Sequence, residues 1–416
     1  MWELIRANKR HSIVLILLMA VVLLGLGYLI GSVFTANMKN GHAMYGGLWG
    51  IAIAGTIWFF LTVLSFSSGD QILLAASKAK RVNHDVHPQL FNVVQEMALA
   101  SGLPMPKVYI IADPAPNAFA TGRSPKTASV AITAGLLSKL NRDELQGVIA
   151  HEMSHILHRD ILFVTVAGIM LGSIVLMSQV FLRGMFYSSL GSRRRYSGSS
   201  KGGGQAQILI MIIAIVAAIL APIFAQLLYF ALSRKREYLA DAGAARLTRY
   251  PAGLAAALEK ISNDHSAQLA CANKVTAPMY IANPLKKNKK AAKLSNLTST
   301  HPPITERIKI LRTMAGGASM KDYSKSFSQV TKANSPLPAA AITDEIIGIR
   351  KPFDQPGKTT KQQKQAHQLG DLMRVVNGFV FLTCSCGLKL KVPPNYKGKT
   401  VVCPKCKKQL SLKKSI

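Results

Sequence analysis

The sequence predicts a mainly α-helical fold in which several membrane-crossing helices accompany a soluble domain of helices and strands. The prediction rests on four long apolar stretches without charged residues, two runs of β-branched residues, and four cysteines clustered near the C-terminus. Each apolar stretch exceeds the ~20 residues that a helix needs to cross a bilayer. The stretches cover residues 12–38, 43–69, 161–182 and 202–233.

Residues 1–69 are expected to form two membrane helices. The first apolar run is too long for a cleaved signal peptide. Basic residues precede the first stretch and follow the second, whereas the short loop between them holds only Lys39. Because positively charged flanks stay in the cytoplasm, both the N-terminus and the chain after the second stretch are expected there. These basic residues are Arg6, Lys9, Arg10, Lys78, Lys80 and Arg81.

Residues 70–315 are expected to form one domain that contains two further membrane helices, at about 161–182 and 207–233. A basic, glycine-rich loop separates these two helices, and full crossing would place it outside, against the positive-inside tendency. A hairpin that enters and returns is the alternative. Either arrangement leaves Asp160 and Arg234 on the same side of the membrane.

The soluble part of this domain shows both helical and strand patterns. Residues 88–101 have apolar residues at helical spacing, and residues 107–112 and 129–133 are β-branched runs typical of strands. Residues 113–123 are rich in Pro, Asn and Gly and are therefore predicted to be a loop. Asn141, with Glu144 three residues later, is the capping-box signature of a helix start.

The helix that starts after Asn141 carries the sequence HEMSH. His151 and His155 are four residues apart, so both imidazoles lie on one helix face, with Glu152 beside them. Catalytic zinc needs protein ligands, an open position for water and a nearby carboxylate to take the water's proton. H-E-x-x-H alone is only moderately specific, and an ordinary helix with two exposed histidines is the alternative.

A third ligand is expected from a separate helix. Glu237 and Asp241 lie one helical turn apart just after the fourth apolar stretch. They could supply a ligand and a group that orients a histidine. Two carboxylates on a solvated helix face are the alternative.

Four blocks of sequence occur in the order NAFATG (117–122), HEMSHILHRD (151–160), SRKREYLADAGAA (233–245) and STHPPITERI (299–308). Over roughly residues 1–315 the chain resembles the HtpX-type membrane metalloproteases, a family related to the prenyl-CAAX endoproteases. The resemblance implies an α+β zincin (gluzincin) protease domain. It also implies zinc ligands at His151, His155 and Glu237.

The same resemblance assigns the remaining roles. Glu152 would be the general base and acid, and Asp241 would orient a ligand histidine. Asn117 and Ala118 would line the substrate cleft. His301 and Arg307 would lie near the scissile carbonyl and stabilise its oxyanion, unless the His-Pro-Pro turn simply ends a helix.

Two further expectations concern the neighbourhood of the site. His158 could reach the metal, but Glu237 would already complete the ligand set, so His158 is expected to be a bystander. The strand at 129–133 could pair with an extended substrate by β-addition.

The spacing of the ligands places the site near the bilayer. His155 lies six residues before the third apolar stretch and Glu237 four after the fourth. The metal is therefore expected within about 10 Å of the membrane surface, at a rise of about 1.5 Å per residue. Membrane proteins or their juxtamembrane segments are the expected substrates.

The resemblance implies a stress-response role in the quality control of damaged membrane proteins. It also implies a bacterial inner-membrane location, with the protease domain facing the cytoplasm. A dedicated processing protease of the prenyl-CAAX type and an inactive scaffold are the alternatives. The presence of Glu152 argues against the scaffold, which needs no general base.

The last hundred residues add a basic linker and a cysteine module. Residues 316–377 are rich in Lys, Ser, Pro and Gln and are predicted to be a partly disordered linker. Residues 378–412 contain paired cysteines that resemble a small structural zinc ribbon, with a redox dithiol as the alternative. A partner for this ribbon is not predicted. The expected zinc content is thus one catalytic ion and one structural ion held by Cys384, Cys386, Cys403 and Cys406.

Positive charge is concentrated in the same region. The net charge is +32, and from Leu285 onward the chain holds 26 Lys and Arg against 6 Asp and Glu. Such a basic tail is expected to be drawn to an anionic lipid surface, with nucleic acid as the less favoured alternative.

Overall fold

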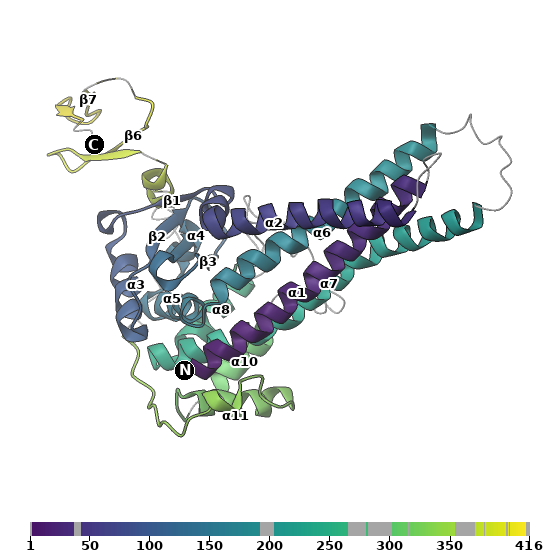
Figure 1. The fold of residues 1–416 in the computed structure, drawn as a ribbon. Coiled ribbons are helices and arrows are strands. Elements are labelled where there is room, and N and C mark those ends of the chain that lie inside the picture. Colours follow the sequence, from purple (N-terminus) through teal and green to yellow (C-terminus); the bar gives the residue numbers. More distant parts are fainter. Residues whose placement is uncertain are drawn as a thin grey trace.

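The structure is a computed structural model. It describes residues 2–36, 43–191, 204–264, 280–281, 302–314, 316–353, 371–377, 379–396, 398 and 400–412. A bundle of long helices projects from one side of a soluble α+β domain, and a small β module lies beyond the domain near the C-terminus (Figure 1). The fold is therefore mainly α-helical, as the sequence predicts.

The bundle consists of α1 (Trp2–Ala36), α2 (Ala43–Ala76), α6 (Asp160–Gly191) and α7 (Gly204–Thr248). Each contains an apolar span long enough to cross a membrane, and each joins the soluble domain at the same end of the bundle (Figure 1). Both α6 and α7 are continuous helices rather than short re-entrant segments. Asp160 and Arg234 accordingly lie at the same end.

The helices of the bundle pack through small and apolar residues. A Cβ on Gly31 of α1 would overlap the carbonyl oxygen of Gly46 on α2, so the two backbones approach as only glycines permit. Leu15, Met19 and Tyr229 are buried between α1, α6 and α7. Large apolar side chains cover the outside, including Trp49, which is 70% exposed, as expected of a lipid-facing surface.

The sheet of the soluble domain has the order β1-β2-β4-β3. β2 and β4 run parallel, and the two outer strands pair antiparallel. The predicted strands are confirmed as β2 and β4. The predicted loop at 113–123 contains the short strand β3, which sequence inspection missed. The bounds are β1 Ala79–Arg81, β2 Lys107–Ile111, β3 Ala118–Thr121 and β4 Ser129–Thr133.

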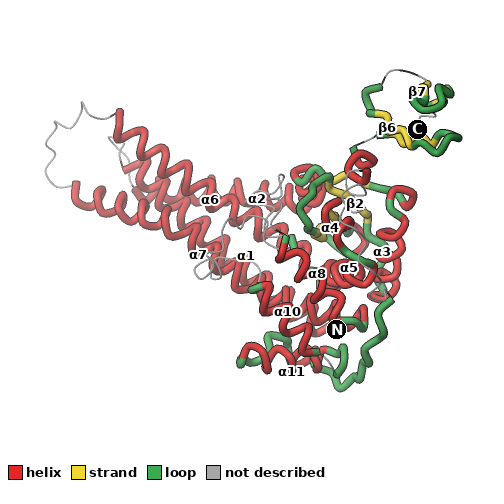
Figure 2. The backbone as a smooth tube through the Cα atoms, turned by 180° about the vertical axis from the view of Figure 1, so that it is seen from behind, coloured by secondary structure: helices red, strands yellow, loops and turns green. Residues whose placement is uncertain are grey.

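Helices pack around this sheet and form the main core (Figure 2). The predicted helix at 88–101 is α3, and its apolar face (Leu90, Val93, Val94 and Met97) is buried. The other helices are α4 Ala134–Lys139, α5 Arg142–Leu157, α8 Pro251–Asn263, α10 Ile304–Thr313 and α11 Met320–Thr331, with the 3₁₀ turns η1 His84–Val86, η2 Pro125–Thr127 and η5 Ala339–Ala341.

The stretch after residue 316 differs from the predicted linker. α11 buries Met320, Tyr323 and Phe327 in the main core, at a spacing of three and four residues that fits one helix face. The surrounding Lys and Ser residues hid this short amphipathic pattern. A short helix follows at residues 371–376. Residues 354–370 of the predicted linker lie outside the described residues.

Residues 342–353, here called the C-terminal strap, run along the soluble domain after α11. Arg350 donates from Nε to the Thr248 carbonyl (2.9 Å) and from Nη2 to Asp143 Oδ1 (2.7 Å). The Phe353 backbone N–H also reaches Asp143. Thr248 ends α7 and Asp143 lies in the first turn of α5, so the strap ties these two helices together.

The C-terminal module consists of two small hairpins. β5 (Val380–Thr383) pairs with β6 (Lys389–Val392), and β7 (Thr400–Val402) pairs with β8 (Gln409–Ser411). Each hairpin contributes a pair of cysteines at one end.

Candidate active site

Helix α5 carries the H-E-x-x-H sequence into the centre of the soluble domain. The predicted capping box is present: Asn141 accepts from the Glu144 N–H, and Glu144 accepts from the Asn141 N–H, each at 2.9 Å. This cap satisfies two backbone donors at the helix start. His151 and Glu152 are buried, and His155 is nearly so. Exposed histidines on an ordinary surface helix are therefore excluded.

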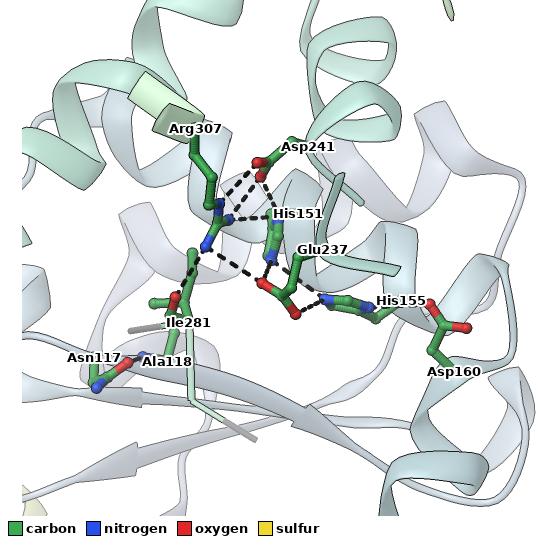
Figure 3. Close-up of polar contacts among 9 residues, drawn as sticks. All are labelled: Asn117, Ala118, His151, His155, Asp160, Glu237, Asp241, Ile281 and Arg307. Atoms are coloured by element: carbon green, nitrogen blue, oxygen red, sulfur yellow. Dashed lines mark hydrogen bonds and ion pairs between the residues drawn. The ribbon is translucent and has the colours of Figure 1, made fainter. Parts of the chain in front are cut away.

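Glu237 reaches the two histidines from α7. Its carboxylate oxygens lie 3.6 Å from His151 Nε2 and 3.5 Å from His155 Nε2, and the two Nε2 atoms are 3.2 Å apart (Figure 3). Two tetrahedral ligands at the usual zinc distances of about 2.0–2.1 Å would be separated by about 3.3 Å. The spacing and the N/N/O donor set therefore fit a zinc ion with an open fourth position.

Two carboxylates hold the opposite side of each imidazole ring. Asp241 Oδ1 lies 3.0 Å from His151 Nδ1, and Asp160 Oδ2 lies 3.2 Å from His155 Nδ1 (Figure 3). Each carboxylate favours a proton on Nδ1, which leaves the Nε2 lone pair for a metal. Asp241 thus contacts a histidine of the H-E-x-x-H motif, and this contact fits the orienting role that the resemblance implies.

Asp160 is a site residue that the sequence reasoning missed. α5 ends at Leu157, and Arg159 adopts a left-handed backbone conformation with φ 59°. The chain therefore turns sharply before Asp160 begins α6, and this turn brings its carboxylate back to His155. A carboxylate directly after the helix that carries the motif was the available signal.

The charges around the cluster favour a cation. Burial lowers the pKa of His155, but its hydrogen bonds to Asp160 and Glu237 outweigh burial and raise the pKa to about 10. Burial likewise lowers the pKa of His151, and hydrogen bonds to Asp241 and Glu237 raise it above its usual value. Since these carboxylates stabilise a positive charge on the rings, they would also stabilise a metal ion between them.

Glu152 is a buried carboxyl group beside the two histidines. Burial raises its pKa, although the neighbouring His151 and His155 oppose that rise. The backbone N–H of Ala120 in β3 hydrogen-bonds to its carboxylate. A carboxyl group with a raised pKa can both accept and return a proton at neutral pH.

Arg307 of α10 contacts two carboxylates of the cluster. Its Nε and Nη2 donate to the two Asp241 oxygens at 2.8 and 2.7 Å, and its Nη1 lies 3.3 Å from Glu237 Oε2. The side chain is 1% exposed. These contacts fit a guanidinium that positions Asp241 and Glu237, and the oxyanion role expected of Arg307 stays a prediction. His301, the other expected oxyanion donor, lies outside the described residues.

Asn117 and Ala118 lie at the start of β3, beside the cluster (Figure 3). The expectation that the strand at 129–133 pairs with substrate is wrong, because β4 is already paired with β2 on one edge and β3 on the other. β3 is one of the two edge strands of this sheet in the described residues, so an added strand could pair along its outer edge.

His158 is not part of the cluster of possible metal ligands in the described residues. Its Nδ1 lies 3.2 Å from Ser154 Oγ, and burial lowers its pKa. Gly243 of α7 packs directly against Ser154, where any Cβ would overlap Ser154 Oγ. Helices α5 and α7 therefore approach closely at this point only because residue 243 has no side chain.

The four C-terminal cysteines form a second cluster that could hold a metal. Cys384 Sγ lies 3.3 Å from Cys406 Sγ, and Cys386 Sγ lies 3.6 Å from Cys403 Sγ. These separations exceed a disulfide bond and approach the ~3.8 Å expected for thiolates about 2.3 Å from a shared tetrahedral zinc ion. The backbone N–H of Cys386 and the Cys406 thiol lower the pKa of Cys384 to about 6, which favours the thiolate that binds metal.

Comparison with known proteins agrees with this site. Residues 84–315 match peptidase family M48. The fold and the site thus define a membrane-embedded protease, and the chain belongs to peptidase family M48. This membership confirms the resemblance to HtpX-type proteases.

Its relatives include two bacterial proteins described as protease HtpX homologs. The one from Dictyoglomus thermophilum is 44% identical over 313 residues, covering 75% of this chain and 94% of that protein. The one from Listeria monocytogenes serovar 1/2a is 42% identical over 316 residues, covering 76% of this chain and 100% of that protein. The crystal structure of S. mikatae Ste24p matches with 20% identity and a TM-score of 0.38, covering 75% of this chain and 67% of that one.

Proposed function

We propose that this M48 protease is a zinc-dependent endopeptidase that cuts misfolded or damaged membrane proteins close to the cytoplasmic membrane face. The observation that carries the proposal is the convergence of His151, His155 and Glu237, within 4.8 Å of one another, beside the buried Glu152. A bound zinc ion would polarise a water molecule and the substrate carbonyl.

The protein's own residues supply the proton transfers. Glu152 accepts the proton of the attacking water, and its raised pKa lets it return that proton to the leaving amine. Asp160 and Asp241 keep the ring nitrogens of His155 and His151 in the tautomer that binds metal.

The position of the site supports membrane-bound substrates. Asp160, in contact with His155, begins α6, and the apolar span of α6 starts six residues later at Val166. That separation is roughly 9 Å along a helix. The basic residues that flank the first two membrane helices support the cytoplasmic orientation, and the bacterial origin of the two relatives supports a bacterial cell membrane as the location.

Substitution of Glu152→Gln in the full chain, reconstituted in lipid vesicles with a fluorescent membrane-protein substrate, tests this function. We expect retained zinc and loss of cleavage, whereas the control Glu259→Gln, on the exposed side of α8, should cut normally. Unchanged cleavage by Glu152→Gln would sink the proposal. Soluble casein cut as readily as the membrane protein would count against the membrane substrate.

We further propose that the chain holds two zinc ions, with the second bound by the cysteine cluster. The metal would fold the small module, whose hairpins bury few apolar side chains. Full-length protein should contain two zinc ions per chain by atomic absorption, and Cys403→Ser should contain one and keep its protease activity. One ion per chain in the unaltered protein would contradict this.

The basic C-terminal third is proposed to contact anionic lipid rather than nucleic acid. Its excess of Lys and Arg lies in the same chain as four membrane spans, so a lipid surface is always near. Cleavage in vesicles should then rise with the anionic lipid fraction and lose this dependence at high salt. Equal rates in neutral and anionic vesicles would exclude a functional role for the charge.

A further inference from the structure

The outer edge of β3 runs beside the metal cluster, and its register defines which backbone groups face away from the sheet. The Thr133 N–H donates to the Asn117 carbonyl at 2.9 Å, so residue 117 is hydrogen-bonded to β4. In an antiparallel pair the hydrogen-bonded positions alternate. The backbone groups of Ala118 and Ala120 therefore point outward.

Partners within the chain already engage these outward groups. The Ala118 N–H donates to Asn117 Oδ1 at 3.1 Å, and the Ala118 carbonyl accepts from the Ile281 N–H at 3.0 Å. The Ala120 N–H is hydrogen-bonded to the Glu152 carboxylate. An incoming strand would need at least one of these groups, because strand addition works through backbone hydrogen bonds.

Ile281 makes two backbone contacts at once. Its N–H bonds to Ala118, and its carbonyl accepts from Arg307 Nη1 at 3.1 Å (Figure 3). The same Arg307 nitrogen lies 3.3 Å from Glu237 Oε2, so this contact adjoins the metal cluster. The Ala118 carbonyl is an acceptor and Arg307 Nη1 is a donor, so together they could bind the backbone N–H and carbonyl of any single residue in an extended peptide.

The preceding residue anchors Ile281 in this position. The Tyr280 ring packs edge-on against Phe119 of β3, with ring centroids 5.1 Å apart. Its hydroxyl lies 3.3 Å from Ser77 Oγ, and both Tyr280 and Ile281 are buried. The anchor rests on side chains that do not take part in the two backbone contacts, so the two can be perturbed separately.

We propose that the Ala118 carbonyl and the Arg307 guanidinium form a two-point site for the backbone of one residue of an extended peptide, and that Ile281 holds this site in place of substrate. Peptide entry at this edge thus requires Ile281 to leave. The inference rests on the proposed endopeptidase function and adds a built-in restraint to it.

Binding of a labelled peptide to a cleavage-deficient protein tests the proposal. The full-length Glu152→Gln protein, loaded with zinc in detergent, would be titrated against the fluorescein-labelled B chain of insulin, with anisotropy as the readout. Adding Ile281→Pro removes the N–H that bonds to Ala118. Loss of one backbone hydrogen bond should tighten peptide binding about fivefold, equivalent to about 1 kcal/mol.

Ile281→Val is the matched control, because it keeps both the N–H and a β-branched side chain, and it should leave the dissociation constant unchanged. A second variant, Tyr280→Leu, loosens the anchor without touching Ala118 or Arg307 and should also tighten binding. Thermal unfolding shows whether Ile281→Pro folds. If it does not fold, the peptide affinity of Tyr280→Leu tests the proposal instead. Weaker or unchanged binding in a folded variant overturns the proposal.

The outcomes also separate this inference from the proposed function. Cleavage of the peptide by the Glu152→Gln protein would contradict the catalytic assignment itself. Lack of cleavage in that protein, together with unaltered peptide affinity in the Ile281 and Tyr280 variants, would contradict only the role of Ile281.

Discussion

Arg307 donates two hydrogen bonds to Asp241, one to each carboxylate oxygen, while Asp241 in turn contacts His151. The guanidinium thereby fixes the orientation of the carboxylate that orients a possible metal ligand. All three side chains are essentially inaccessible to solvent, so water cannot replace any of these contacts cheaply.

Arg307→Lys should weaken zinc binding at the histidine site by about 10- to 100-fold, the usual effect of losing an outer partner of a ligand. Lysine keeps the charge but cannot make the two-pronged contact. Competition with a chromogenic chelator measures the affinity. Arg312→Lys is the control, because Arg312 makes a similar contact with Glu259 on the exposed side of α10. Equal affinity in both variants would show that the paired contact is dispensable.

Asp160→Asn should lower zinc affinity by about tenfold, because a neutral amide holds the proton on His155 Nδ1 less strongly than a carboxylate does. The same chelator titration applies. Asp344→Asn, at an exposed ion pair with Lys321 far along the chain, should bind zinc normally. A normal affinity in Asp160→Asn would mean that His155 is held in place by packing alone.

Gly243→Ala should destabilise the soluble domain by roughly 1–3 kcal/mol, the usual cost of overpacking, and should reduce zinc content. The added methyl group would overlap Ser154 Oγ between the two ligand histidines. Gly172→Ala offers a matched control, since nothing lies within 4 Å of a Cβ at that position on α6. Thermal unfolding in detergent and metal analysis give the two readouts, and full stability in Gly243→Ala would refute the close approach.

Truncation should locate the end of the catalytic unit at the C-terminal strap. In vesicles of neutral lipid, a chain ending after Phe353 should keep full activity, whereas one ending after Gly316 should lose it. The shorter chain exposes Tyr323 and Phe327, whose burial contributes roughly 1.5–3 kcal/mol each. Limited proteolysis and cleavage assays in vesicles compare the two. Activity in the shorter chain would make α11 and the strap accessory elements.

Much of the architecture could be predicted from the sequence because its signals are local. Apolar length indicates the membrane helices, and the spacing of Leu90, Val93 and Met97 indicates α3. The capping box at Asn141 marks the start of α5. The pairing of His151 and His155 follows from the helical repeat alone.

The features that sequence reasoning missed depend on tertiary contacts. β3 is a strand only because β4 lies beside it, since its residues alone read as a loop. Asp160 reaches His155 because the chain turns at Arg159. Helix α11 is stabilised because its three apolar residues are buried in the main core. The contact between Ile281 and Ala118 joins positions separated by more than 160 residues, which no local pattern can report.

Helix α7 runs without interruption from its apolar span to Glu237, Asp241 and the end that the strap grips. It therefore links the apolar span, which contains Pro222, to the candidate active site. A bilayer that is thinner than the span favours tilting of the helix, and such a tilt would change the position of the Glu237 carboxylate relative to the histidines on α5. We therefore expect the rate of hydrolysis to change with membrane thickness, which cleavage assays in vesicles of different acyl-chain length would measure.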